Sequence, residues 1–280
     1  MHRKEIETRL ATLVRENRFT IAVIFPAVGA ILLVASAAGW LPEPLAFNPL
    51  LILFGTAVMR LPLIVGVLPL LDRRASIAVL GLAGYTWGIE IIGVATGYPY
   101  GGFEYGVQLG PMIFGVPLAL PLFFIPLVLN AYLLALLVFP DLMRRAITRI
   151  PLAVAFVIAV DVVLDPAAVA LGFWSFEDGG MFYGVPLSNY AGWILSGTVA
   201  VIAVEFAFSP DGLRQRVEEC EFVLDDLVSF TLLWGSINVL FGNWIPVIVT
   251  VGFLVALLLV GRLDFLPART FRNRAASIRG

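Results

Sequence analysis

Cysteine, histidine and charged residues are scarce in this 280-residue sequence. A single cysteine, Cys220, excludes an internal disulfide bond and a cysteine-ligated metal cluster. The single histidine, His2, excludes ligation of a metal or haem by several histidines. We therefore expect neither a metal site nor a cofactor.

Motifs that bind phosphate or supply a hydrolytic nucleophile are absent as well. The sequence contains no Walker-type loop, no GxGxxG and no GxSxG. The net charge of −2 gives no indication of nucleic-acid binding. The chemistry must therefore come from residues that these motifs do not include.

Long apolar runs make up most of the chain. It is 60% hydrophobic and 14% charged, with a mean hydropathy of +0.96. About 20 apolar residues cross the hydrocarbon core of a bilayer, and such runs must be helical to satisfy their backbone hydrogen bonds. We expect an all-α integral membrane protein with about eight transmembrane helices in one bundle, at residues 19–40, 46–71, 76–97, 112–139, 150–172, 186–208, 223–241 and 244–262. The chain 1–280 is then a single polytopic membrane domain with a lead-in at 1–18, a bundle at 19–262 and a basic tail at 263–280.

Clusters of lysine and arginine alternate along the chain with pairs of these apolar runs. All but one of the 18 basic residues fall in five clusters, namely Arg3 to Arg18, Arg73/Arg74, Arg144 to Arg149, Arg214/Arg216 and Arg262 to Arg279. The other connections, around 40–48, 97–112, 172–187 and 241–244, contain none. Because cytoplasmic loops carry the excess of basic residues, we expect a multi-pass protein of the cell membrane with both termini cytoplasmic.

A weak internal repeat links the third and fourth runs to the fifth and sixth. Glu90 precedes Gly97 by seven residues, as Asp165 precedes Gly172, and Gly-Val-Pro-Leu follows at both 115–118 and 184–187. The spacing predicts two copies of a helix–loop–helix unit in parallel orientation.

Five ionisable residues interrupt the apolar runs: Arg60, Glu90, Asp161, Asp165 and Glu205. A charge near the bilayer centre costs about 2.5–3.5 kcal/mol, so such residues usually face a cavity or a partner. Glu90 and Asp165 lie seven residues inside their runs, about 10 Å below the outer surface. Asp161 lies one turn deeper on the same face as Asp165. Glu205 is close enough to the cytoplasmic end to reach water.

Arg60 is the only cation available to the three outer acids. We expect it to contact Glu90, Asp161 or Asp165, which can be a purely structural ion pair. Three acids still outnumber one base, and an apolar environment disfavours the charged carboxylate. At least one acid is therefore expected to be neutral. A neutral carboxyl group beside an ionised one is an arrangement that general acid–base catalysis uses.

Aromatic residues surround the predicted depth of the acids. Trp87 lies three residues from Glu90 on the same helical face, and both large outer loops are rich in Tyr, Trp and Phe. Many of these rings can simply belong to the membrane interface. Aromatic faces also attract cations, so the same rings suit a substrate that is apolar at rest and cationic during reaction.

Two other function classes remain open. The DxxxD pattern at 161–165 is similar to the diphosphate-binding aspartates of intramembrane prenyltransferases, although it lies in the outer half without neighbouring Lys or Arg. Helix-breaking prolines and a repeat are also compatible with a transporter or a lipophile-binding protein. Transporter repeats usually extend over whole halves and are often inverted, whereas this one covers four runs in parallel.

Two sequence blocks resemble the carotenoid hydratase family of CruF type. They are TGYPYGGFEYGVQLGPMIFGVPLALPL at 96–122 and LDPAAVALGFWSFEDGGMFYGVPLSNYAGW at 164–193. The family often has Trp after the first Gly-Val-Pro block, where this chain has Phe123 and Phe124. The resemblance implies a hydro-lyase that adds water to terminal C=C bonds of an acyclic carotenoid of the bisanhydrobacterioruberin type. It implies a carotenoid and membrane lipid as partners and no cofactor, and it leaves open a carotenoid elongase as partner and the oligomeric state.

Roles for the acids follow from the physical interpretation of the sequence. We predict catalytic roles for Glu90, Asp165 and Asp161. Glu90 is the proton donor, and Asp165, which precedes Pro166, is the base that orients water. Asp161 supports them or pairs with Arg60. The residues predicted to contact the substrate are Arg60, Trp87, Tyr98, Glu104, Trp174, Tyr183, Asn189 and Trp193.

Overall fold

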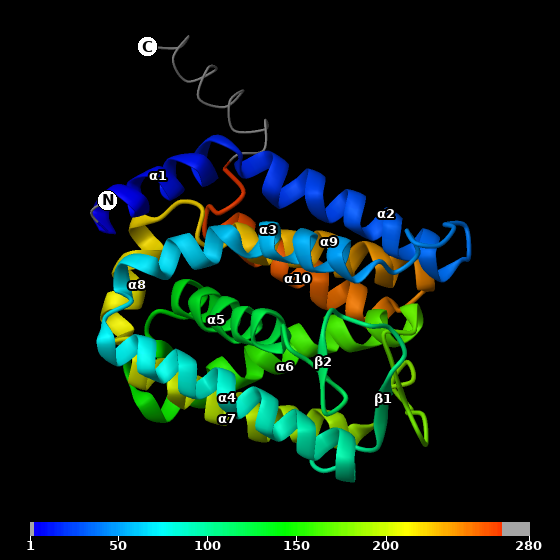
Figure 1. The fold of residues 1–280 in the computed structure, drawn as a ribbon. Coiled ribbons are helices and arrows are strands. Elements are labelled where there is room, and N and C mark those ends of the chain that lie inside the picture. The colour runs from blue at the N-terminus through cyan, green and yellow to red at the C-terminus, as the bar shows by residue number, and fades with distance from the viewer. Residues whose placement is uncertain (1–2, 265–280) are drawn as a thin grey trace.

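The computed structural model describes residues 3–264 and shows a bundle of helices with four short strands at one end (Figure 1). The helices are α1 (Arg3–Glu16), α2 (Phe25–Ala37), α3 (Pro49–Val67), α4 (Arg73–Thr96), α5 (Leu120–Val138), α6 (Ala146–Leu171), α7 (Leu187–Ala207), α8 (Pro210–Glu219), α9 (Asp225–Phe241) and α10 (Trp244–Leu259). His2 and all but the first two residues of the expected tail at 263–280 lie outside the described residues.

Within residues 3–264, six segments are long and apolar enough to cross a membrane. They are Thr20–Ala37, Pro49–Leu70, Arg73–Thr96, Leu120–Val138, Ala146–Leu171 and Leu187–Ala207. The helical membrane architecture is therefore confirmed. The last two expected spans form helices of 17 residues in α9 and 16 in α10, shorter than the about 20 residues of a typical span. The count of eight spans and the cytoplasmic termini stay predictions.

The fourth expected span, 112–139, begins later than predicted. Its first residues form a small hairpin, in which β2 (Met112–Ile113) pairs with β3 (Val116–Pro117), and α5 begins only at Leu120. Phe114 and Gly115 in the turn have φ of 51° and 79°. A left-handed backbone cannot continue a right-handed helix, so this apolar segment folds back over the bundle.

Helix ends follow ordinary capping chemistry. Asn48 accepts hydrogen bonds from the first amides of α3, and Asp72 accepts one from Ala75 in α4. Gly97 ends α4 and Gly172 ends α6, both in the left-handed conformation that favours glycine. These two caps fix the depth of Glu90 and Asp165 along their helices.

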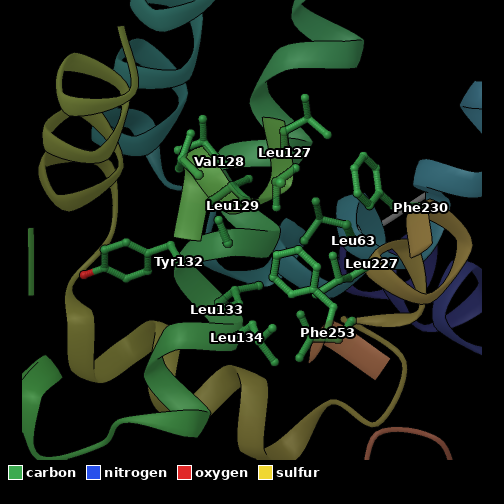
Figure 2. Packing of buried hydrophobic residues seen from close by; sticks show 14 of the residues in the cluster. Leu63, Leu127, Val128, Leu129, Tyr132, Leu133, Leu134, Leu227, Phe230 and Phe253 are labelled. Carbon is green, nitrogen blue, oxygen red and sulfur yellow. The ribbon is translucent and has the colours of Figure 1, made fainter. Parts of the chain in front are cut away.

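The core lies around α5, which is buried over most of its length. In Figure 2, Leu127, Leu133 and Leu134 gather with side chains of α3, α9 and α10, whereas Tyr132 points to the other side of the helix. The Tyr132 hydroxyl donates to Glu205 at 3.3 Å. A central apolar helix gives the surrounding helices a common surface on which to pack.

The two predicted repeat units share several unusual contacts. Phe114-Gly115 and Tyr183-Gly184 both have positive φ. A Cβ on Gly115 would lie 3.3 Å from a methyl of Val94, and one on Gly184 would lie 2.9 Å from the matching methyl of Val169. These equivalences agree with two copies of one unit, and the repeat itself stays a prediction.

The loops of the two units meet at one end of the bundle. β1 (Phe103–Tyr105) pairs antiparallel with β4 (Trp174–Phe176), which joins the long loop after α4 to the loop after α6. α1 and α8 lie at the opposite end (Figure 1). The structure therefore places the basic residues of α1 and α8 at the end of the bundle away from the aromatic loops.

Candidate active site

An apolar cavity of about 900 Å³, counted to its open mouth, lies beneath the paired strands. Its lining residues come from α3, α4, α5, α6, α7 and α9 and from the two aromatic loops. Six of the side chains predicted for the site line it, namely Arg60, Glu90, Asp165, Trp174, Asn189 and Trp193. Acids from two different helices thus face one space.

The strands β1 and β4 form the aromatic cover of this cavity. Phe103 pairs with Phe176 and Tyr105 pairs with Trp174 across the two strands. Successive residues of a strand point to opposite faces, and all four of these rings line the cavity. Glu104, the residue between them, is exposed. The cover therefore presents rings to the cavity and its acidic side chain away from it.

Glu90 is held by the hydroxyl group of Tyr105. The hydroxyl donates to Glu90 Oε1 at 2.5 Å. Burial, together with the neighbouring Glu90, raises the pKa of Tyr105 well above its ordinary value. Tyr105 therefore keeps its proton at neutral pH and acts as the donor in this contact. Glu90 retains part of its accessible surface at the cavity that it lines.

Asp165 and Asp161 are joined by one amide group. Asn189 on α7 donates to Asp165 Oδ2 and, at 3.4 Å, to Asp161 Oδ2. Asp165 is 3% exposed and Asp161 is 1% exposed. Asp165 and Asn189 line the cavity, whereas Asp161 lies behind them with one oxygen lacking a partner among the described residues. Asp161 can thus act on the cavity only through its neighbours.

The prediction that Arg60 contacts Glu90, Asp161 or Asp165 is wrong. Its guanidinium binds Asp226 of α9 at 2.7 Å, and Asn130 of α5 donates to the other oxygen of the same carboxylate at 2.6 Å. None of Glu90, Asp161 or Asp165 forms an ion pair with Arg60 in the described part of the chain. Because Asp226 neutralises the one basic residue on the cavity wall, Glu90 and Asp165 have no cationic partner there.

Four of the predicted substrate contacts lie elsewhere. The Trp87 indole donates to the carbonyl of Pro117 at 3.2 Å, and the Tyr183 hydroxyl accepts from the Ile245 amide at 3.2 Å. The exposed residues Tyr98 and Glu104 do not line the cavity either. Trp87 and Tyr183 therefore make structural contacts, whereas Tyr98 and Glu104 face outward. The geometry gives no reason to assign any of the four to the substrate. Glu205 forms an ion pair with Arg149 at 2.6 Å, also away from the cavity.

Several cavity residues were missed from the sequence. Tyr105 had a visible signal, because it alternates with Phe103 in an aromatic strand. No pattern in the sequence indicates Trp234, since only the packing of α9 against α3 and α6 brings it to the wall.

Two acidic residues away from the cavity were also missed. Asp225 and Asp226 lie in the first turn of the seventh expected span, although acidic residues there are plain in the sequence. Asp225 binds Arg18 at 2.7 Å.

Metal ligation finds no support in the side-chain geometry. Over residues 3–264, no group of three or more His, Cys, Asp and Glu side chains is arranged to hold a metal ion. The cavity instead combines two separately held carboxyl groups with stacked and edge-on rings. Phe124 and Trp193 stack at 5.1 Å, and Tyr105 meets Trp174 edge-on at 6.3 Å. Such a wall can hold an apolar ligand and shield a cation.

Comparison with known proteins agrees with these features. The family model described as carotenoid biosynthesis protein matches residues 47–257. The chain is 56% identical over 263 residues, 94% of its own length and 89% of the relative's, to a protein of Haloarcula japonica named bisanhydrobacterioruberin hydratase. No solved structure matches. The chain therefore belongs to the carotenoid biosynthesis protein family, and within it to the CruF-type carotenoid hydratase family that its sequence blocks resemble.

Proposed function

We propose that the protein is a carotenoid hydratase that adds water across terminal C=C bonds of an acyclic carotenoid and forms tertiary alcohols. Identity of 56% to a relative named bisanhydrobacterioruberin hydratase supports this substrate class. The observation that carries the chemistry is the placement of Glu90 and Asp165 on one aromatic, apolar cavity. A long polyene partitions into lipid, so an enzyme that acts on it must offer its site within the membrane.

The reaction begins with proton transfer from the neutral carboxyl group of Glu90. The π electrons of the terminal double bond take this proton onto the less substituted carbon, and a tertiary carbocation forms at the other carbon. Glu90 is now a carboxylate, and Tyr105 donates a hydrogen bond to it. Hydrogen bonds to the charged form stabilise that form, so Tyr105 favours the donation step.

Asp165 completes the addition as a carboxylate. It stabilises the carbocation and accepts a proton from the water molecule whose oxygen bonds to the cation. Return of this proton from Asp165 to Glu90 restores the starting state. The net reaction converts an alkene and a water molecule into an alcohol. Asn189 fixes the Asp165 carboxylate from α7, and Asp161 positions Asn189 from below. No step consumes a cofactor.

The aromatic wall protects the intermediate. Rings of Phe103, Trp174 and Trp193 line the cavity beside the two acids, and their faces stabilise a nearby cation by about 0.5–2 kcal/mol each. The cover of β1 and β4 limits access of bulk water, which favours capture of one oriented water molecule. The Asn189 amide donates to both Asp161 and Asp165, which supports a role for this pair in hydration over diphosphate binding by the DxxxD pattern.

Isotope labelling tests the proposed function. The purified protein is incubated with an anhydro-carotenoid in H₂¹⁸O, and in parallel under ¹⁸O₂ in ordinary water. We expect one ¹⁸O atom from water in each new hydroxyl group and none from ¹⁸O₂. Hydroxylated product that carries oxygen from O₂, or the absence of product from a folded protein that binds the carotenoid, would contradict hydration. The double variant Glu90→Gln/Asp165→Asn is the inactive control.

A further inference from the structure

A second cavity of about 1000 Å³, counted to its open mouth, lies between α2, α3 and α9. Its wall extends from the connection at 41–48, through apolar side chains of α2 and α3, to Arg60 in the middle of α3. Leu32, Leu45 and Leu51 on this wall are themselves 40%, 50% and 48% exposed. The cavity is therefore apolar and opens toward the lipid between α2 and α3.

The second cavity adjoins the candidate active site directly. Four residues line both spaces, namely Arg60, Phe123, Phe173 and Trp234. Phe173 and Trp234 meet edge-on with centroids 6.0 Å apart. The division between the two spaces is thus made of side chains, and small rotations of these rings change its width without moving a helix.

The charge of Arg60 does not exclude an apolar chain from this junction. Its guanidinium is bound by Asp226, and Asp226 is fully buried and also held by Asn130. The charge is therefore neutralised on the α9 side. Long basic side chains pack their aliphatic stems along apolar surface, which leaves the Arg60 stem as the part suited to a hydrocarbon.

We propose that this second cavity holds the polyene chain of the same carotenoid molecule whose terminal double bond lies between Glu90 and Asp165. The inference rests on the proposed function and deepens it. A conjugated chain is long, rigid and apolar, so it needs an apolar slot that continues from the reacting end. The shared wall at Phe123, Phe173 and Trp234 provides that continuity, and the opening between α2 and α3 lets the chain enter from the lipid.

Gly55 offers a way to block the second cavity without disturbing the fold. It lies on the cavity wall in α3, and a Cβ added there meets no atom within 4 Å. The side chain of Gly55→Phe therefore extends into open space. Gly84→Phe is the matched control, because Gly84 is an exposed position inside α4 that also has nothing within 4 Å and lines neither cavity. Both variants change helix propensity equally.

Binding of the long carotenoid is the first measurement. Purified protein is titrated with an anhydro-carotenoid, and binding is followed by co-elution of the visible absorption band and by quenching of tryptophan fluorescence. Overfilling a packed site costs enough to expect about tenfold weaker binding, or more, for Gly55→Phe. Gly55→Ala and Gly55→Leu should give graded smaller losses, and Gly84→Phe should bind like the wild type.

The second measurement separates the two cavities. A short acyclic isoprenoid alkene with the same terminal group needs only the reaction chamber, so Gly55→Phe should hydrate it at the wild-type rate while losing activity on the long carotenoid. If the wild-type protein does not hydrate either substrate but Gly55→Phe still loses binding of the long carotenoid, the second cavity is supported and only the proposed function is contradicted. Unchanged long-chain binding in Gly55→Phe overturns the inference, as does release of a co-purified membrane lipid with carotenoid binding intact. Equal loss of the short and long substrates also overturns it.

Discussion

The hydroxyl group of Tyr105, on the strand that covers the cavity, donates a 2.5 Å hydrogen bond to the carboxyl group of Glu90 on α4. This contact connects the loop after α4 to the acid proposed to donate the proton. A hydrogen bond to a charged group is worth about 1.5–3 kcal/mol. Tyr105→Phe should therefore slow hydration about tenfold or more and leave carotenoid binding intact.

The measurement for Tyr105→Phe is a single-turnover rate across a range of pH. Because Tyr105 contacts one protonation state of Glu90 more strongly than the other, its removal should displace the pH–rate profile as well as lower the rate. Tyr98→Phe is the control, since Tyr98 is exposed and does not line the cavity. An unchanged profile with normal rate would remove Tyr105 from the mechanism.

Replacing either proposed catalytic acid by its amide should slow turnover strongly without unfolding the protein. Glu90→Gln and Asp165→Asn are nearly isosteric, and general acid–base groups contribute about 10²–10⁴ in rate. Each variant should accumulate unhydrated carotenoid that remains bound. Product analysis by chromatography and mass spectrometry of cells that express each variant gives the measurement.

Glu104→Gln is the matched control for these two variants. Glu104 lies next to Tyr105 on β1 but is exposed and points away from the rings that line the cavity. We expect it to retain the wild-type rate. If Glu104→Gln loses activity and Glu90→Gln and Asp165→Asn do not, the acid is on the outer loop and the proposed site is in the wrong place.

The distance of the two acids from the ends of their helices could be predicted because it depends on a helix alone. Rise per residue is constant, so Glu90 and Asp165 each lie seven residues before a glycine cap whatever surrounds them. The partner of Arg60 could not be predicted in this way. It depends on which helices are neighbours, and α9, far along the chain, packs beside α3.

The contacts made by the loops could not be predicted from helical periodicity either. The pairing of β1 with β4 joins segments about 70 residues apart and brings Tyr105 onto Glu90. Trp87 illustrates the opposite error. It shares a helical face with Glu90, yet its indole is bound by the carbonyl of Pro117, which arrives from the hairpin before α5. Helical spacing gives a direction around one helix and does not say what occupies the space beside it.

Removal of Arg60 should destabilise the bundle more than removal of the whole ion pair. Asp226 is fully buried, and Arg60→Met leaves its charge compensated only by Asn130. Breaking a buried pair costs about 3–5 kcal/mol. The double variant Arg60→Met/Asp226→Asn should recover part of this loss, as measured by unfolding of the detergent-solubilised protein.

An exposed ion pair provides the comparison for Arg60. Arg9 binds Glu5 at 2.7 Å on α1, where both side chains are largely exposed. Exposed pairs contribute about 0–1 kcal/mol, so Arg9→Met should change stability little. A double variant at Arg60 and Asp226 that is no more stable than Arg60→Met alone would show that Asp226 has another way to be compensated.

The outer position of the aromatic loops can be tested by labelling a single introduced cysteine. Met181 is 92% exposed in the loop after α6, and Glu218 is exposed on α8 at the opposite end of the bundle. Burial raises the pKa of the native Cys220 thiol, so little of it is thiolate at neutral pH and its background reaction should be low. Replacing it by Ala removes the remainder. In intact cells, an impermeant thiol reagent should label Met181→Cys, and should label Glu218→Cys only after lysis. The reverse order would invert the topology and place the mouth of the cavity on the cytoplasmic side.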